Sequence, residues 1–283
     1  MNGLNTLYIK TNDGLKLCVN TKGDKNKTPI ILIHGFMQNK TCWLYQFMDE
    51  QLYENFYLIS YDQRGHGKSS KPNEIKSYSS DLLSDDLNSI IKYLRLNKKP
   101  ILISWSYGGL SLSTYLKNYG QETISGIIIM ASVISFNIDS VKKHLNKELV
   151  NILPSVIENN VNYDQFNQSI LTFIDLAAES KNITKDLYYM LAGQALETTL
   201  MSRKSLLSFY VNNDDYLKTI NIPTLLIWGE KDNHVKLSYC DYLKTLIPHA
   251  NVIKFKECGH TVQIEKHKDF NYNIYNFVKN LQY

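Results

Sequence analysis

The sequence contains few cysteines, and none of them stand in pairs. The four, Cys18, Cys42, Cys240 and Cys258, form no C-x-x-C unit and none of the spacings that are typical of a zinc site. We therefore expect buried free thiols, with neither a disulfide framework nor a cysteine-based metal centre.

A long apolar run is also missing. No stretch of the 283 residues approaches the ~18 consecutive apolar residues that a membrane-spanning helix needs. Residues 1–10 hold no charged leader followed by an apolar core, which is the pattern of a secretory signal. These two absences predict a cytoplasmic protein without a membrane span.

Neither sign of charge dominates. The chain has 31 basic and 27 acidic residues, for a net charge of +4, and its basic residues are scattered. A nucleic-acid-binding protein would be expected to carry a basic stripe or cluster. Its absence argues against a nucleic-acid partner, and the hydrophobic content of 43% is enough for a substantial core.

Short apolar runs alternate with helical spacing through most of the chain. A hairpin with the turn Asn12-Asp13-Gly14 joins predicted strands at 7–9 and 16–21. Further strands are predicted at 29–33, 56–61, 100–103, 124–131, 223–228 and 251–255, and helices at 43–53, 78–94, 110–119, 235–246 and 267–281. This alternation predicts an α/β fold with a mostly parallel, doubly wound central sheet.

The alternation stops between residues 133 and 217, where only helical patterns appear. Phe166, Ile170, Phe173 and Ile174 share one face of a predicted helix, and Thr184 is a candidate N-cap of another that runs to about residue 200. We therefore expect a core formed by 1–132 and 218–283. We expect 133–217 to form a helical cap, inserted before the last two strands, that covers the carboxyl edge of the sheet as a lid.

Ser106 lies between a predicted strand and a predicted helix, in Ser104-Trp105-Ser106-Tyr107-Gly108-Gly109. The pattern G-x-S-x-G places a serine at a sharp turn where neighbouring backbones nearly touch, which favours glycine. Gly108 fits the pattern, whereas Ser104 stands in place of its first glycine. Centring the pattern on Ser104 would put Ser106 at the second glycine, so Ser106 is the better candidate nucleophile. The alternative is a serine-rich turn without chemistry.

Two further loops carry groups that such a serine needs. Asp232 follows the strand predicted at 223–228, and His260 follows the last predicted strand. The carboxyl ends of parallel strands share one edge of a sheet, so these residues can converge there. A histidine can take the proton of a serine hydroxyl, and a carboxylate can orient the histidine. Glu230 competes with Asp232 for the carboxylate role.

Several motifs in this order resemble the α/β-hydrolase family over nearly the whole chain. They are the order Ser106, Asp232, His260, the stretch Ile33-His34-Gly35-Phe36, the turn Asp62-Gln63-Arg64-Gly65-His66-Gly67-Lys68-Ser69, and Gly259-His260 followed by Glu265. The resemblance implies a Ser106-His260-Asp232 triad and an oxyanion hole formed by the backbone amides of Phe36 and Tyr107. His34 and His66 are expected to be structural, and Asp62 and Arg64 to pair within their turn.

The implied activity is hydrolysis of a carboxylic ester or related acyl bond of a small molecule, without metal or cofactor. The motifs are most similar to those of carboxylesterases and cofactor-free haloperoxidases (perhydrolases), and a serine nucleophile argues against the haloalkane and epoxide branches. Phe36, Trp105 and Tyr107 are predicted to wall an apolar pocket. A thioesterase, a perhydrolase, a carbon-carbon bond hydrolase and a non-hydrolysing receptor of the same fold remain alternatives.

Overall fold

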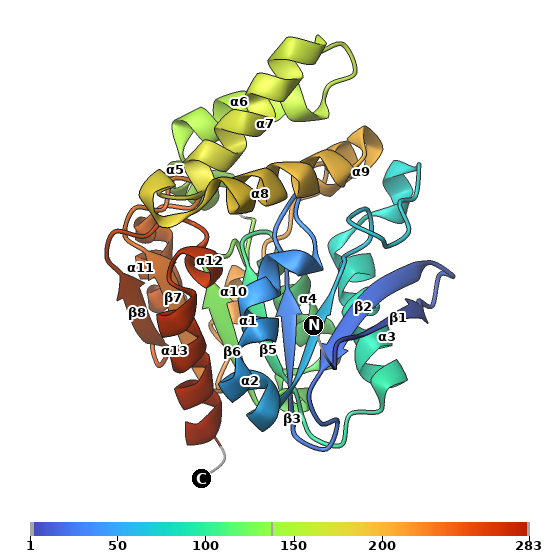
Figure 1. Cartoon of the computed structure of the whole chain (residues 1–283), viewed down its shortest axis with the longest axis vertical. Helices are drawn as coiled ribbons and strands as arrows, with labels where there is room; N and C mark the ends of the chain where they lie inside the picture. The colour runs from blue at the N-terminus through green and yellow to red at the C-terminus, as the bar shows by residue number, and fades with distance from the viewer. Residues whose placement is uncertain (1–2, 137, 282–283) are drawn as a thin grey trace.

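An eight-stranded sheet runs through the computed structural model, which describes residues 3–136 and 138–281 (Figure 1). The strands lie in the order β1-β2-β4-β3-β5-β6-β7-β8. Their bounds are β1 Asn5–Lys10, β2 Lys16–Lys22, β3 Thr28–Ile33, β4 Phe56–Tyr61, β5 Ile101–Trp105, β6 Gly126–Met130, β7 Thr224–Gly229 and β8 Asn251–Phe255. Each corresponds to a predicted strand, so the predicted fold class is confirmed.

The sheet begins antiparallel and continues parallel. β1 pairs with β2 and β2 pairs with β4 in antiparallel register, whereas the pairs from β3 to β8 are parallel. Gly14 closes the first hairpin with a φ of 87°, a conformation that glycine adopts without steric cost. The apolar runs of β3, β5, β6 and β7 are buried along their whole length, because helices cover both faces of the sheet.

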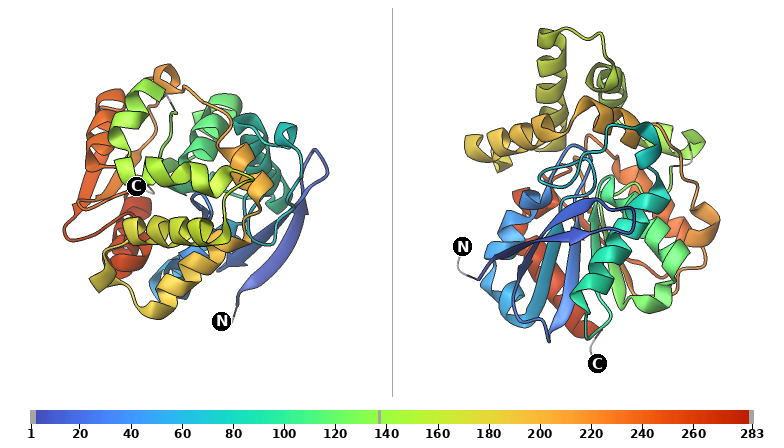
Figure 2. Two further views of the ribbon diagram at one scale, coloured as in Figure 1. Left: turned by 90° about the horizontal axis from the view of Figure 1, so that it is seen from above. Right: turned by 90° about the vertical axis from the view of Figure 1, so that its right-hand side faces the viewer.

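Helices cover the two faces of the sheet (Figures 1 and 2). On one face lie α3 (Ser80–Leu94), α4 (Gly108–Tyr119) and α11 (Leu237–Leu246), and on the other α1 (Leu44–Met48), α2 (Glu50–Asn55) and α13 (His267–Asn280). Shorter helices are η1 Lys40–Trp43, η2 Ile75–Ser77, η3 Gln121–Thr123 and α12 Val262–Glu265. No helix in the described ranges is long and apolar enough to cross a membrane.

The single helix predicted at 43–53 is wrong, because the chain breaks it at Asp49. This residue has an extended backbone, with φ −76° and ψ 112°, and separates α1 from α2. Its carboxylate accepts a hydrogen bond from the amide of Leu52 at 3.0 Å and so caps α2. A short acidic side chain that satisfies a helix N-terminus competes with continuation of the preceding helix.

The chain between β6 and β7 is helical, and its helices α5 to α9 lie beyond the carboxyl ends of the strands, whereas α10 lies beside the sheet (Figure 1). It comprises α5 Ile138–His144, α6 Lys147–Ile157, α7 Tyr163–Ala177, η4 Ser180–Asn182, α8 Lys185–Glu197, α9 Leu200–Leu206 and α10 Asp214–Leu217. Thr184 caps α8 as predicted, accepting from the amide of Leu187 at 3.3 Å. The division into core and cap remains a prediction, and its residues 1, 2, 137, 282 and 283 lie outside the described ranges.

Candidate active site

Ser106 occupies a strained turn between β5 and α4. Its φ is 55°, in the left-handed region that a residue with a side chain rarely adopts, at a cost of about 1–3 kcal/mol. The turn is held on both sides: the Ser106 amide donates to the carbonyl of Met130 at 3.2 Å, and its carbonyl accepts from the amides of Gly109 and Val133, each at 3.1 Å. The sequence motif thus folds into the sharp strand-to-helix turn that it predicts.

Two glycines allow neighbouring backbones to approach this turn. A Cβ atom on Gly108 would lie 2.7 Å from the carbonyl oxygens of Ile33 and His34, and one on Gly35 would lie 2.8 Å from the Cβ of Ser106. At Ser104, where the pattern expects glycine, the side chain is buried and its Oγ lies 3.0 Å from the Oγ of Ser132. A hydrogen bond to a neighbouring small residue therefore accommodates the departure from the motif.

His260 and Asp232 meet at the carboxyl edge of the sheet. The Nδ1 of His260 donates to the Oδ2 of Asp232 at 2.8 Å. The other oxygen of Asp232 accepts from the amides of His234 at 2.8 Å and Val235 at 2.9 Å, which fixes the carboxylate. Glu230, the competing carboxylate, is exposed, so the structure brings Asp232 to the histidine.

The other ring nitrogen of His260 is not engaged by any residue that the structure describes, and His260 lines the same cavity as Ser106. Because the carboxylate of Asp232 can only accept, Nδ1 carries the proton and Nε2 carries the lone pair. This Nε2 is buried and has no hydrogen-bond partner among the described residues. Ser106 and His260 both line one small cavity, so the serine hydroxyl and an unoccupied base face the same space.

Glu265 and Trp105 hold the loop that carries His260. The carboxylate of Glu265 accepts from the amides of Gly259 at 3.0 Å and Thr261 at 3.3 Å, and from the Thr261 hydroxyl at 2.9 Å. The indole nitrogen of Trp105 donates to the carbonyl of His260 at 2.9 Å. The sequence motif includes Glu265 but does not indicate that it accepts hydrogen bonds from the His260 loop. The position of Trp105 beside Ser106 likewise does not indicate its hydrogen bond to His260.

His34 and His66 hold the loop between β3 and η1, as expected of structural residues. The Nδ1 of His34 donates to the carbonyl of Gly35 at 2.8 Å, and its Nε2 accepts from the amide of Gln63 at 2.9 Å. The Nε2 of His66 accepts from the amide of Met37 at 3.3 Å. Burial lowers the pKa of both histidines to about 3, so both rings are neutral at ordinary pH.

The backbone amides of Phe36 and Tyr107 follow β3 and Ser106, respectively. In residues 3–136 and 138–281, neither amide donates a hydrogen bond to the protein. The ring of Phe36 lines the small cavity with Ser106. The Tyr107 side chain is not among the lining residues: its hydroxyl donates to the carbonyl of Leu206 at 2.6 Å, and its ring packs on Phe36 with centroids 5.9 Å apart.

The predicted pairing of Asp62 with Arg64 is wrong, because other elements supply a partner for each. Asp62 accepts from the Lys40 ammonium at 2.7 Å and from the amide of Lys68 at 2.8 Å. Arg64 donates to both oxygens of Asp86 on α3, each at 2.7 Å, and both side chains are buried. Burial raises the pKa of Asp86 to about 6, against the opposing effect of Arg64.

The cavity at Ser106 is small and mainly apolar. Its volume is about 10 Å³, and its walls include Phe36, Trp105, Phe173, Ile174 and Leu191. The last three come from α7 and α8, within the predicted cap. This space holds about one water molecule, so little more than a methyl-sized group fits beside the serine.

His234 also lines this cavity, and sequence analysis missed it. Its ring lies 4.6 Å from the ring of His260, and its Nε2 donates to the carbonyl of Phe173 on α7 at 2.8 Å. Burial lowers the pKa of His234 well below its usual range. His234 thus connects the Asp232 loop to α7 by a hydrogen bond. These segments are far apart in the sequence, so no local pattern indicates the contact.

Comparison with known proteins agrees with this geometry. The profile of a family described as the alpha/beta hydrolase fold matches residues 28–267. The chain belongs to this family. Monoacylglycerol lipase ABHD6 of Homo sapiens is 25% identical to this α/β-hydrolase over 283 residues, covering 93% of the chain and 79% of that protein.

Two further relatives of this α/β-hydrolase span most of it. A putative non-heme chloroperoxidase of Synechocystis sp. is 29% identical over 221 residues, covering 74% of this chain and 75% of its own. The crystal structure of a putative aryl esterase from Burkholderia cenocepacia superposes with a TM-score of 0.89 and 28% identity, covering 98% of this chain and 99% of the other. The chain is a hydrolase of the esterase and haloperoxidase-like branch that the sequence predicts.

Proposed function

We propose that this α/β-hydrolase cleaves a carboxylic ester through an acyl-enzyme on Ser106. The observation that carries the proposal is that His260 lines the same cavity as Ser106, with its Nδ1 held by Asp232 at 2.8 Å and its buried Nε2 without a hydrogen-bond partner among the described residues. A neutral imidazole oriented in this way is a general base for a serine hydroxyl. The esterases and lipases among its relatives support the same reaction class.

The reaction proceeds in two halves. The Oγ of Ser106 attacks the ester carbonyl carbon while its proton passes to Nε2 of His260. The tetrahedral intermediate then expels the alcohol, which takes that proton, and leaves an acyl-serine. A water molecule then gives a proton to Nε2 of His260 and attacks the acyl carbon. The second tetrahedral intermediate expels the Oγ of Ser106, which takes that proton back from His260, and the carboxylic acid is released. Asp232 stays ionised and stabilises the imidazolium that forms in each half.

The amides of Phe36 and Tyr107 are the proposed donors to the oxyanion. Both lie beside Ser106, and neither is used by another described residue. Two fixed donors aimed at the developing negative charge are worth about 3 kcal/mol each in barrier height, by analogy with other oxyanion holes. The buried His34 and His66 support this role because they hold the backbone on either side of Phe36.

An activated serine can be tested with a fluorophosphonate probe and with p-nitrophenyl acetate. We expect the wild type to be labelled and to hydrolyse the ester. Ser106→Ala should abolish both signals, since it removes the nucleophile. The matched control is Ser104→Ala, two residues away, which loses the hydrogen bond to Ser132 and should keep both activities.

Two results would contradict the proposal. Loss of labelling in Ser104→Ala and its retention in Ser106→Ala would mean that the nucleophile is Ser104. A wild-type protein that is folded but neither labelled nor active would support the alternative of a non-hydrolysing receptor.

A further inference from the structure

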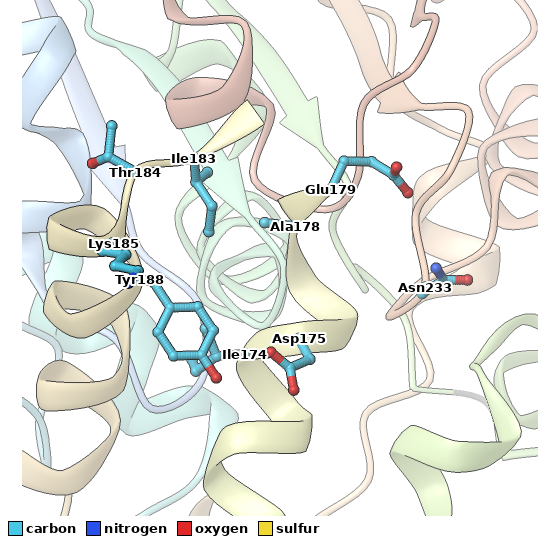
Figure 3. A pocket seen from close by; sticks show the side chains of 9 residues that line it. All are labelled: Ile174, Asp175, Ala178, Glu179, Ile183, Thr184, Lys185, Tyr188 and Asn233. Atoms are coloured by element: carbon cyan, nitrogen blue, oxygen red, sulfur yellow. The ribbon is translucent and has the colours of Figure 1, made fainter. Parts of the chain in front are cut away.

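A second, larger cavity opens between α7 and α8 (Figure 3). We call it the vestibule, and its volume is about 480 Å³, against about 10 Å³ for the inner cavity at Ser106. Figure 3 shows the nine side chains that line it, including Asp175, Glu179 and Tyr188 around the end of α7 and the start of α8. The vestibule therefore offers the volume for a substrate that the inner cavity lacks.

Three elements contribute to both spaces through adjacent residues. The loop after β7 gives His234 to the inner cavity and Asn233 to the vestibule, and α8 gives Leu191 to the inner cavity and Tyr188, one turn earlier, to the vestibule. Among the described lining residues, Ile174 on α7 is common to both. The side chain of Ile174, which is 1% exposed, is thus the partition between the two spaces.

The end of α7 is fixed to the loops of the active site. The carbonyl of Phe173 accepts from His234 at 2.8 Å, and the carbonyl of Ala177 accepts from the amide of His260 at 2.8 Å. The amide of Glu179 donates to the carboxylate of Glu265 at 3.1 Å. Swinging α7 away from the sheet would break these hydrogen bonds beside the catalytic histidine.

α8 is fixed to the loop after β3 on the opposite side. The carbonyl of Leu191 accepts from the Gln38 side chain at 3.3 Å. Asn39 donates from its amide to Gln194 at 3.4 Å and from its side chain to Glu197 at 2.9 Å. Hydrogen bonds thus hold both helices to the core. Rotation of the Ile174 side chain would therefore join the two spaces while breaking fewer hydrogen bonds than movement of α7 or α8.

The vestibule is lined by residues that neighbour the contacts of His260. Asn233 is next to His234, whose ring contacts that of His260, and Glu179 follows shortly after Ala177, whose carbonyl holds the His260 amide. The leaving alcohol must lie against the Nε2 of this histidine to receive the proton. The loops of the oxyanion amides, at Phe36 and Tyr107, contribute no described residue to the vestibule.

The lining chemistry indicates which alcohol would fit. The lining carries the carboxylates of the exposed Asp175 and the half-buried Glu179 and the ammonium of the exposed Lys185, together with neutral hydrogen-bonding groups on Thr184, Tyr188 and Asn233. Lys231 lies 3.9 Å from the carboxylate of Glu179, so charges of the two signs balance around the vestibule, and no cluster of ammonium groups is present among its described lining residues to bind an anionic ligand. Ile174 and Ile183 supply apolar surface. The vestibule suits an uncharged alcohol with an apolar stem.

We propose that the vestibule holds the alcohol part of the ester substrate and that Ile174 sets how bulky this part can be. The inner cavity then receives a short acyl group. This inference rests on the proposed esterase function and deepens it, because it assigns the two sides of the ester bond to two different spaces. The substrate class that follows is an ester of a short acid with a larger, uncharged alcohol.

Isomeric esters test this assignment without changing the size or apolarity of the substrate. Hexyl acetate and ethyl hexanoate have the same formula and differ only in which side of the ester is bulky. We expect the wild type to show a kcat/KM for hexyl acetate about tenfold above that for ethyl hexanoate, since one misplaced methylene in a tight pocket already costs about tenfold.

Variants at Ile174 separate the partition from general packing. Ile174→Ala should raise kcat/KM for acetates of alcohols bulkier than hexanol relative to kcat/KM for ethyl acetate, and Ile174→Val should act in the same direction with a smaller effect. The matched control is Ile170→Ala, one turn earlier on α7, because Ile170 is also buried but lines neither space. It should change no substrate preference.

The outcomes distinguish this inference from the proposed function. A wild-type preference for ethyl hexanoate, or equal effects of Ile174→Ala and Ile170→Ala on the two isomers, would overturn the assignment of the vestibule while ester hydrolysis stands. If neither isomer is hydrolysed and Ser106 is not labelled by fluorophosphonate, the proposed function fails and the inference fails with it.

Discussion

Replacing His34 by glutamine should make the stability of the protein less dependent on pH. His34 is buried and neutral in the folded state, with a pKa lowered to about 3 by burial, whereas an unfolded histidine titrates near ~6.5. Below ~6.5 the unfolded chain binds a proton that the folded chain excludes. The stabilising contribution is therefore complete above ~6.5 and is lost as the pH falls toward the folded pKa.

The size of the effect follows from the difference between the pKa of the unfolded histidine and the solution pH. At about pH 5 the unfolded pKa lies roughly 1.5 units above the solution pH, and each unit is worth about 1.4 kcal/mol. His34 should therefore account for about 2 kcal/mol of the stability that the wild type loses between about pH 7.5 and about pH 5. Glutamine retains an acceptor for the amide of Gln63 and does not titrate, so His34→Gln should lack this part of the loss.

Urea denaturation at the two pH values, followed by tryptophan fluorescence, measures both losses, since Trp43, Trp105 and Trp228 are all buried. His249→Gln is the control, because His249 is exposed and its variant should lose as much stability on acidification as the wild type. A His34→Gln protein that loses the same free energy of unfolding as the wild type would refute the reasoning. It would mean that His34 takes up a proton in the folded state at ordinary pH.

Two further substitutions test the contacts around the site. Glu265→Gln should lower the free energy of unfolding by about 1.5–3 kcal/mol and reduce kcat/KM for p-nitrophenyl acetate. The reason is that an amide cannot accept all the hydrogen bonds that hold the His260 loop. Unchanged kinetics would mean that Glu265 does not position His260. Asp86→Asn should lower the free energy of unfolding by about 3 kcal/mol in urea denaturation, because it removes the buried carboxylate that binds Arg64 with both oxygens and leaves only the part-exposed Asp13 to balance that charge. The exposed Asp215→Asn should leave the free energy of unfolding almost unchanged, and a similar loss in both variants would contradict the buried-pair argument.

The strands and the three proposed catalytic residues could be predicted because their signals are local. A strand buried on both faces needs a continuous apolar run, and β3, β5, β6 and β7 each have one. The strand order then follows from short right-handed connections, which bring the loops with Ser106, Asp232 and His260 to one edge. The elbow could be predicted despite Ser104, because the strain at Ser106 depends on close approach at Gly108 and Gly35.

Contacts between distant segments could not be predicted. Arg64 pairs with Asp86 on α3 and with Asp13 in the first hairpin, and nothing near the turn indicates that these acidic residues face it. His234 donates a hydrogen bond to the carbonyl of Phe173, and Trp105 donates one to the carbonyl of His260. Because every residue has a backbone carbonyl, the sequence does not indicate these partners. The break at Asp49 was missed because apolar spacing continues across it, whereas its cap depends on one side-chain rotamer.

The strand order also determines when each part of the site can form during synthesis. β1 to β6 take adjacent places in the sheet, and β7 and β8 add to one edge of it. A ribosome releases the chain from its N-terminus, and the backbone partners of Ser106, at Met130 and Val133, emerge before α5 to α10. Asp232 and His260 follow the last two strands. A nascent chain therefore carries Ser106 in its turn before it carries His260, the proposed base, so the proposed ester cleavage can begin only after β8 and the loop that follows it have been synthesised.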